Sequence, residues 1–267
     1  MPLIAASGRR AVESEVGPVA GHSKWKNIRI RKGRVDAQKG KAFTKLAKEI
    51  MMACRNGGPD PEANFRLKDA IVRAREASMP SSNIDRLLEK ARGAADADNI
   101  EELVYEGYGP AGVAILVEAA TENRNRTAAG MRGLFAKNGG AMGESGCVGW
   151  LFERRGEIRV EAKPADEERL LNAALEAGAL DVESDEEGFV VFTEFAELHQ
   201  VREALTKEKF KVKTAGFTQV AKTSVEVGLA DAPTLLRLMD LLEDHDDVQH
   251  VYANFELPAE VMEALDA

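Results

Sequence analysis

Residues 157–215, EIRVEAKPADEERLLNAALEAGALDVESDEEGFVVFTEFAELHQVREALTKEKFKVKTA, decide the fold of this chain. Short apolar runs typical of strands alternate with longer segments whose apolar residues recur at helical spacing. Their order is strand, helix, strand, strand, helix, strand, which is the ferredoxin-like pattern. The predicted strands are 158–161, 180–184, 189–193 and 210–214, and the predicted helices are 166–177 and 195–207.

The segments on both sides of this unit predict a second α/β domain. The apolar patterns predict strands at 103–106, 113–119, 148–152, 223–229 and 248–257, and helices at 123–137 and 232–243. The elements after residue 216 have no partner nearby in sequence, but they can complete a sheet with those before residue 156. We therefore predict that residues 99–156 and 216–267 form one discontinuous middle domain, into which residues 157–215 are inserted.

Residues 36–92 are predicted to form a three-helix unit. The first helix starts near Asp36 and ends at Gly57, with a packing face and a lysine-rich face. Asp60 is the expected N-cap of the second helix, and Ser82–Asp85 has the spacing of a capping box for the third. Helices this short, below about 12–15 residues, are marginal alone and must pack together. The fold class is therefore α+β with three domains, a basic helical domain (21–98) and the two α/β domains, preceded by a disordered extension (1–20).

The charge of the chain is divided between its two ends. The whole chain has 36 basic and 45 acidic residues, a net charge of −9. Residues 21–55 hold eleven Lys and Arg against two acidic residues, whereas residues 156–267 hold ten against 26. Such asymmetry indicates a polyanion-binding end, with the acidic half expected to face away from the polyanion. The alternative is that the basic stretch is a solvated helix face.

No motif predicts catalysis or a cofactor. Gly107, Gly109 and Gly112 have the spacing of the dinucleotide fingerprint, but a strand follows them where that fingerprint needs a helix. The four histidines and two cysteines lack metal-ligand spacing, and no apolar run reaches the about 20 residues of a membrane span. We expect a cytoplasmic protein that is not an enzyme, with no metal, no cofactor, no small-molecule substrate and no membrane partner.

Two regions predict contact with nucleic acid. In the basic arm around Trp25, cations can neutralise phosphates and the indole can stack on an unpaired base; the alternative for Trp25 is a hydrophobic anchor. At the start of helix 123–137, the backbone N–H groups favour an anion, and arginines there suggest an external one; the alternative is a surface cap without a ligand. The candidate binding residues are His22, Ser23, Lys24, Trp25, Lys26, Asn27, Arg29, Arg31, Lys32, Lys39, Lys41, Lys45, Asn123, Arg124, Asn125 and Arg126.

Read together, these regions resemble the YebC/PmpR family, whose mitochondrial members are translational activators of a cytochrome oxidase subunit. The matching stretches are AGHSKWKNI (20–28), DAQKGKAFTKLAKEI (36–50), GGPDPEANFRLKDAI (57–71), YEGYGPAGVAILVE (105–118), NRNRTA (123–128) and KNGGAMGESGCVGWLF (137–152). Family members usually begin Met-Ala-Gly-His-Ser-Lys-Trp. We therefore expect Val19 to be the true start of translation, with residues 1–18 outside the native protein.

The resemblance implies a three-domain, non-enzymatic regulator of gene expression. Family members are commonly labelled DNA-binding transcriptional regulators, and they are also understood as translation factors that help the ribosome through proline-rich stretches. The implied partners are promoter DNA, or ribosomal and transfer RNA on the ribosome together with ribosomal proteins. The sequence shows no helix-turn-helix with a short turn and no base-reading pattern, which favours RNA. A protein-only adaptor without nucleic-acid contact is the alternative.

Overall fold

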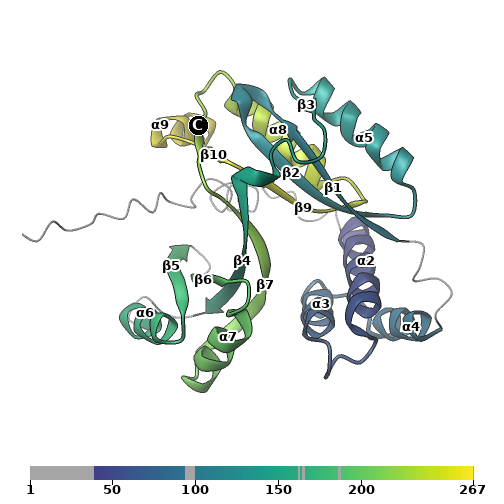
Figure 1. Ribbon diagram of the computed structural model, residues 1–267, viewed down its shortest axis with the longest axis vertical. Coiled ribbons are helices and arrows are strands. Elements are labelled where there is room, and N and C mark those ends of the chain that lie inside the picture. The colour runs from purple at the N-terminus through teal and green to yellow at the C-terminus, as the bar shows by residue number, and fades with distance from the viewer. Residues whose placement is uncertain (1–38, 94–99, 162, 164–165, 186–187, 267) are drawn as a thin grey trace, which may run out of the picture.

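The computed structural model describes residues 39–93, 100–161, 163, 166–185 and 188–266 (Figure 1). Within these residues a group of helices is followed by two antiparallel four-stranded sheets with helices packed on them. The predicted α+β fold class is confirmed. None of the described helices is long and apolar enough to cross a membrane.

The N-terminal helices are α2 (Lys39–Gly57), α3 (Phe65–Glu76) and α4 (Ser81–Arg92). They pack around buried apolar side chains, with Ile50, Leu67 and Ala70 completely inaccessible to solvent. The predicted packing of three short helices on one another is therefore confirmed.

Both predicted caps of these helices are wrong. The N-cap of α3 is Asn64, whose side chain accepts a hydrogen bond from the N–H of Leu67 and donates one to the carbonyl of Ala53 on α2. An amide can cap one helix and tie it to another, whereas the carboxylate of Asp60 can only accept. The helix α4 begins one residue before Ser82, and its N-cap, Pro80, makes no side-chain hydrogen bond.

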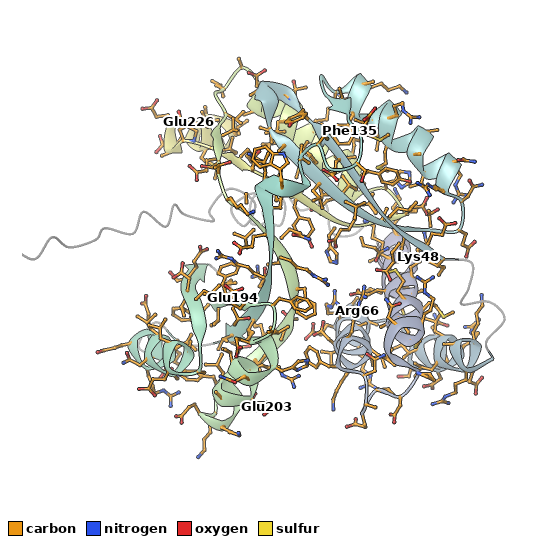
Figure 2. The ribbon with its side chains drawn as sticks, in the orientation of Figure 1. Lys48, Arg66, Phe135, Glu194, Glu203 and Glu226 are labelled. Atoms are coloured by element: carbon orange, nitrogen blue, oxygen red, sulfur yellow. The ribbon has the colours of Figure 1, made fainter. Side chains whose placement is uncertain are left out.

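The middle sheet has the strand order β3-β1-β2-β9. Its strands are β3 (Ala141–Met142), β1 (Glu101–Tyr108), β2 (Ala114–Thr121) and β9 (Val248–Ala253). The helices α5 (Arg124–Lys137) and α8 (Ala232–Glu243) cover one face, and Phe135 lies between α5 and the sheet (Figures 1 and 2). The strands β1 and β2 form an antiparallel hairpin, so a strand follows the three glycines as predicted. The connection contains the short helix η2 (Pro110–Gly112), and Gly112 has a φ of +73°.

The predicted strand 223–229 does not join this sheet. Instead, β8 (Val225–Glu226) pairs in parallel with β10 (Phe255–Glu256) in a separate two-stranded sheet. The chain ends in a helix that the sequence analysis missed, α9 (Ala259–Asp266).

The second sheet has the order β5-β6-β4-β7 and is antiparallel throughout. Its elements follow the predicted ferredoxin-like order: β4 (Phe152–Glu161), α6 (Glu167–Glu176), β5 (Ala179–Asp185), β6 (Gly188–Glu194), α7 (Leu198–Lys207) and β7 (Lys211–Ala221). Buried side chains from both helices and the sheet, including Leu170, Val191 and Leu205, form its core.

The strands β4 and β7 extend beyond the predicted inserted unit. Their pairing runs from Phe152 opposite Ala221 to Glu161 opposite Lys211, so they join the two sheets in Figure 1. The predicted strand 148–152 is wrong, because a short helix, η3 (Gly149–Leu151), precedes β4. The backbone N–H groups of Val148 and Gly149 are not available to a sheet, because both donate hydrogen bonds to the carboxylate of Glu106.

The helical group also contacts the second sheet's helices. The ring of Phe65 on α3 lies edge-on to that of His199 on α7, with centroids 4.9 Å apart. The guanidinium of Arg202 lies 4.0 Å from the centroid of the Phe65 ring. This contact fixes α3 against α7 by packing and a cation–π interaction.

Candidate nucleic-acid interface

The two predicted binding regions are described to different extents. The arm residues His22, Ser23, Lys24, Trp25, Lys26, Asn27, Arg29, Arg31 and Lys32 lie outside the described residues. Lys39 is the first residue of α2, and Lys41 and Lys45 follow on the same helix. The residues Asn123, Arg124, Asn125 and Arg126 form the start of α5 and are all exposed.

The start of α5 is a capped helix end with cationic side chains. The side chain of Asn123 is the N-cap and accepts a hydrogen bond from the N–H of Arg126 at 3.1 Å. The helix carries no acidic residue, and its basic residues Arg124, Arg126, Arg132 and Lys137 are all exposed. Cations are unfavourable at a helix N-terminus, so these arginines are stabilised by a nearby anion.

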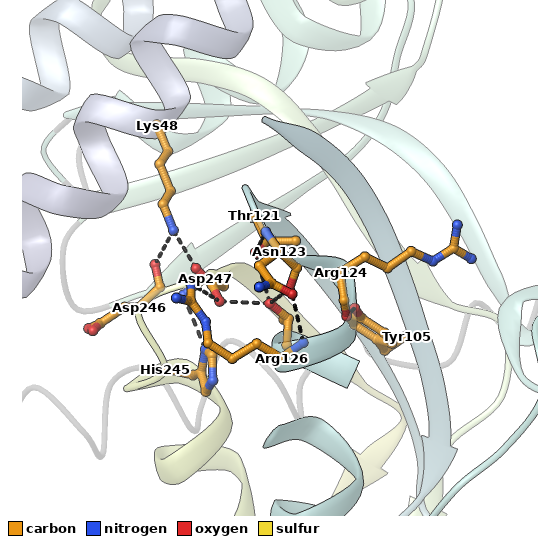
Figure 3. Close-up of polar contacts among 10 residues, drawn as sticks. Lys48, Tyr105, Thr121, Asn123, Arg124, Arg126, His245, Asp246 and Asp247 are labelled. Carbon is orange, nitrogen blue, oxygen red and sulfur yellow. Dashed lines mark hydrogen bonds and ion pairs between the residues drawn. The ribbon is translucent and has the colours of Figure 1, made fainter. Parts of the chain in front are cut away.

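Asp247 joins this end of α5 to the helical group (Figure 3). Its carboxylate, with the side chain only 4% exposed, lies 2.5 Å from the Nζ of Lys48 on α2. The hydroxyl of Thr127 on α5 donates to the other carboxylate oxygen at 2.7 Å, and the guanidinium of Arg126 lies 3.6 Å from it. The predicted region at Arg124–Arg126 is thereby fixed beside α2, while the side chain of Arg124 points away from the network.

The lysine face of α2 points at the C-terminal end of α8. Lys41 donates to the carbonyl of Asp244, Lys45 to that of Glu243, and Lys48 to that of Asp246. Cations near a helix C-terminus are stabilising because its last carbonyls are unpaired and carry partial negative charge. The acidic loop at residues 243–247 therefore lies directly against the lysines of α2.

The network has a defined protonation state. Burial opposes ionisation of Asp247, but hydrogen bonds from Lys48 and Thr127 outweigh it and hold the pKa of the carboxyl below its usual value. Burial lowers the pKa of His245, and the N–H of Asp247 donates to its Nδ1 at 3.1 Å. The contact between α2 and α5 therefore contains the ionised carboxylate of Asp247, beside the imidazole of His245, which accepts a hydrogen bond.

Sequence reasoning missed the residues that bring the two regions together. The sequence places Lys48 on the lysine-rich face of its helix without indicating a partner, and it gives no distinct role to Asp247. Thr127 was recognised only as part of the NRNRT stretch. The alternation of acidic residues with His245 gave no signal, because Asp247 and Asp246 look alike in sequence although only Asp247 is buried.

The neighbouring glycine-rich loop is held by an internal anion. The carboxylate of Glu106 accepts hydrogen bonds from the backbone N–H groups of Gly146, Val148 and Gly149 at 2.6–2.7 Å. Burial opposes its ionisation, yet these three donors keep its pKa below the usual value. The N–H groups that could have bound a phosphate in this loop are therefore already occupied. Among the residues the structure describes, no cluster of three or more His, Cys, Asp or Glu could hold a metal.

Two family models match almost all of the chain from residue 23 onward. The model described as the TACO1/YebC protein N-terminal domain matches residues 23–94, and the model of the TACO1/YebC second and third domain matches residues 100–255. The chain belongs to the TACO1/YebC family. The predicted resemblance is confirmed.

Relatives from this family match over nearly their whole length. A protein of Carboxydothermus hydrogenoformans is 52% identical over 242 residues, covering 90% of this chain and 99% of its own. A Geobacter sulfurreducens protein is 49% identical over 247 residues, covering 92% and 100%. Both are named probable transcriptional regulatory protein. A crystal structure of a conserved hypothetical protein, Aq1575 of Aquifex aeolicus, is similar with a TM-score of 0.79 and 46% identity, covering 86% of this chain and 95% of that one.

The family membership supports the predicted role as a regulator. The relatives' names point to nucleic acid as the partner class. They do not distinguish DNA from RNA.

Proposed function

We propose that this protein regulates gene expression by binding nucleic acid through one surface that combines the basic N-terminal region with the start of α5. The observation that supports the proposal is the Lys48–Asp247–Arg126 network, in which α2 and the start of α5 contact the same carboxylate. Exposed cations neutralise phosphates and release counterions, and this effect supplies most sequence-independent affinity. The exposed Arg124 and Arg126 next to α2 are suited to this role.

Within that class, we propose structured RNA on the ribosome as the target, with translation through proline-rich stretches as the step affected. Arginines at a helix end and a tryptophan in the arm suit a partner with both phosphates and unpaired bases. Promoter DNA is the competing target. The prediction that no short turn joins two helices is wrong, because only residues 77–80 separate α3 from α4, which is the turn length of a helix-turn-helix. The first turn of α4, Ser81–Ile84, however, carries no basic residue, which does not suit a helix whose N-terminal residues enter the major groove.

Binding is tested by fluorescence anisotropy with structured RNA and with duplex DNA over a range of salt concentrations. Arg124→Ala/Arg126→Ala is expected to reduce the slope of log K against log salt by about 1.5, because each phosphate contact contributes about 0.7–0.9. The matched control, Lys207→Ala/Arg237→Ala, removes the same charge from exposed positions on α7 and α8 and is expected to keep the slope. Equal slopes for both variants would contradict the proposed surface.

The target is tested by ribosome profiling and sucrose-gradient sedimentation of cells with and without the protein. If translation is affected, ribosomes should pause at proline-rich codons in the cells that lack the protein. In the cells that contain it, the protein should co-sediment with ribosomes. Transcript changes without such pauses would instead favour promoter DNA. If replacement of Lys24, Lys26, Arg29 and Arg31 by alanine changes neither ribosome nor DNA association, the protein-only adaptor remains.

A further inference from the structure

Two aromatic side chains far apart in sequence meet on the surface of the middle domain. Tyr108 ends β1 and Trp150 lies in η3, and their side chains are 40% and 65% exposed. The Tyr108 hydroxyl and the Trp150 Nε1 both donate to the carbonyl oxygen of Cys147, at 3.1 and 3.2 Å. The polar ends of both rings are therefore fixed at one point, and their apolar surfaces stay exposed to water.

The backbone around Cys147 is fixed by hydrogen bonds to the carboxylate of Glu106. The three backbone N–H groups bound by Glu106 belong to residues on both sides of Cys147. A Cβ at Gly143 would lie 2.5 Å from the Cys147 Sγ, so the loop is tightly folded at this point. Because the loop is fixed in this way, the two rings are held in place before any ligand binds, which lowers the entropy cost of binding.

The rings of Tyr108 and Trp150 have no stacking partner among the described residues. At the other exposed aromatic pair, the rings of Phe195 and Phe217 stack on each other at 4.3 Å, and Arg154 lies 4.6 and 4.9 Å from their centroids. No aromatic ring or guanidinium among the described residues stacks on Tyr108 or Trp150 in this manner. The surface at Trp150 therefore differs from an internally satisfied aromatic cluster.

A cation contacts the backbone of Trp150. The Nζ of Lys222 donates to the main-chain carbonyl of Trp150 at 3.1 Å, and the lysine is exposed. The acidic residue of the loop, Glu144, is exposed and lies three residues before Cys147. An open aromatic face next to a lysine is the combination by which proteins bind single-stranded nucleic acid, since the ring stacks on a base and the ammonium meets a phosphate.

We propose that Trp150 and Tyr108, with Lys222, form a stacking site for an unpaired base of a single-stranded nucleic acid. The inference rests on the proposed function and adds a second contact to it. The start of α5 binds phosphates of any nucleic acid, whereas this site selects segments in which a base is free to leave the stack. Single-stranded RNA and DNA both offer such a base, and a continuous duplex does not.

The test is an affinity comparison with oligouridine RNA, oligothymidine DNA and an RNA duplex. Trp150→Ala is expected to weaken binding of both single strands on the order of 5- to 150-fold, the factor that base–aromatic stacking contributes, and to leave duplex affinity unchanged. Trp150→Phe keeps a ring and should retain most of the affinity. The control Leu229→Ala truncates a side chain of similar exposure, 53%, and should change none of the three affinities.

Ultraviolet cross-linking gives a direct second readout that does not depend on a variant folding. In the unmodified protein, the oligouridine is expected to cross-link to the tryptic peptide 138–154, which contains Trp150.

Three results would overturn the site: equal affinity of Trp150→Ala and the unmodified protein for single strands, an equal loss for duplex, or no cross-link on peptide 138–154. Each of these leaves the proposed function intact as long as the unmodified protein binds nucleic acid. If the unmodified protein binds none of the three probes, the proposed function fails, and the stacking site fails with it. Binding of a protein partner that Trp150→Ala abolishes, with nucleic-acid affinity unchanged, would assign the rings to a protein interface instead.

Discussion

Replacing Asp247 by asparagine tests whether this carboxylate holds the helical group on the middle domain. The change keeps the size of the side chain and an oxygen that can accept from Thr127, but it removes the negative charge beside Lys48. A hydrogen bond to a charged group contributes about 1.5–3 kcal/mol. Lys48 keeps its bond to the carbonyl of Asp246, and the ion pair with the exposed Arg126 contributes below about 1 kcal/mol. We therefore expect a loss near the lower end, about 2 kcal/mol.

A loss of about 2 kcal/mol lowers the melting temperature of a chain of this size by about 4–8 °C. The matched control is Asp246→Asn, which makes the same change of charge one residue away on an exposed side chain. Its effect should be within about 0.5 kcal/mol. Differential scanning calorimetry at neutral pH compares the two variants with the unmodified protein.

The same calorimetry at low pH tests whether the ionised carboxylate of Asp247 is the cause of the difference in stability. The pKa of Asp247 is below its usual value of 3.8 in the folded protein. Its contribution to stability is therefore complete above the unfolded pKa and is lost as the pH falls through the folded pKa. The difference in melting temperature between Asp247→Asn and the unmodified protein should hold at neutral pH and shrink below about pH 3.8. Equal melting temperatures of the two variants at neutral pH, or a deficit that persists in strong acid, would refute the reasoning.

Two further substitutions test the remaining contacts. Glu106→Gln leaves at least one of three backbone donors without an acceptor, so the free energy of unfolding, measured with urea, should fall by about 1–3 kcal/mol. The control is Glu144→Gln in the same loop. Equal stabilities of the two variants would contradict the anchoring role of Glu106. Because the pKa of Glu106 is lowered, its contribution should disappear as the pH falls through that folded pKa. Phe65→Ala removes the contacts with Arg202 and α7 and should destabilise the folded protein by about 2 kcal/mol. The free energy of unfolding is measured in the same way. An unchanged value would show that α3 and α7 do not touch in solution.

Local patterns predicted most of the secondary structure. The helix expected at 232–243 is found with those bounds, and the ferredoxin-like order of residues 157–215 is confirmed. These elements are long or strongly periodic, so each is determined by its own residues. The failures occur where a distant group competes for the backbone. In the strand expected at 148–152, the N–H groups of Val148 and Gly149 donate to Glu106 instead of to a neighbouring strand. Asn64 replaces the expected cap of α3, and its side chain also reaches α2.

The residues of the candidate interface also divide into those that local sequence predicts and those that only long-range contacts define. The sequence by itself determined the separation of charge, the cationic start of α5 and the family to which the chain belongs. Only the tertiary structure decided that the acidic loop after α8 lies against the lysines of α2, and that Asp247 rather than Asp246 is the buried partner. Lys48 and Asp247 are 199 positions apart, and no local periodicity relates such residues. Their pairing depends on how two separately folded units dock, because a charge is stabilised by the groups around it in space and not by its neighbours along the chain.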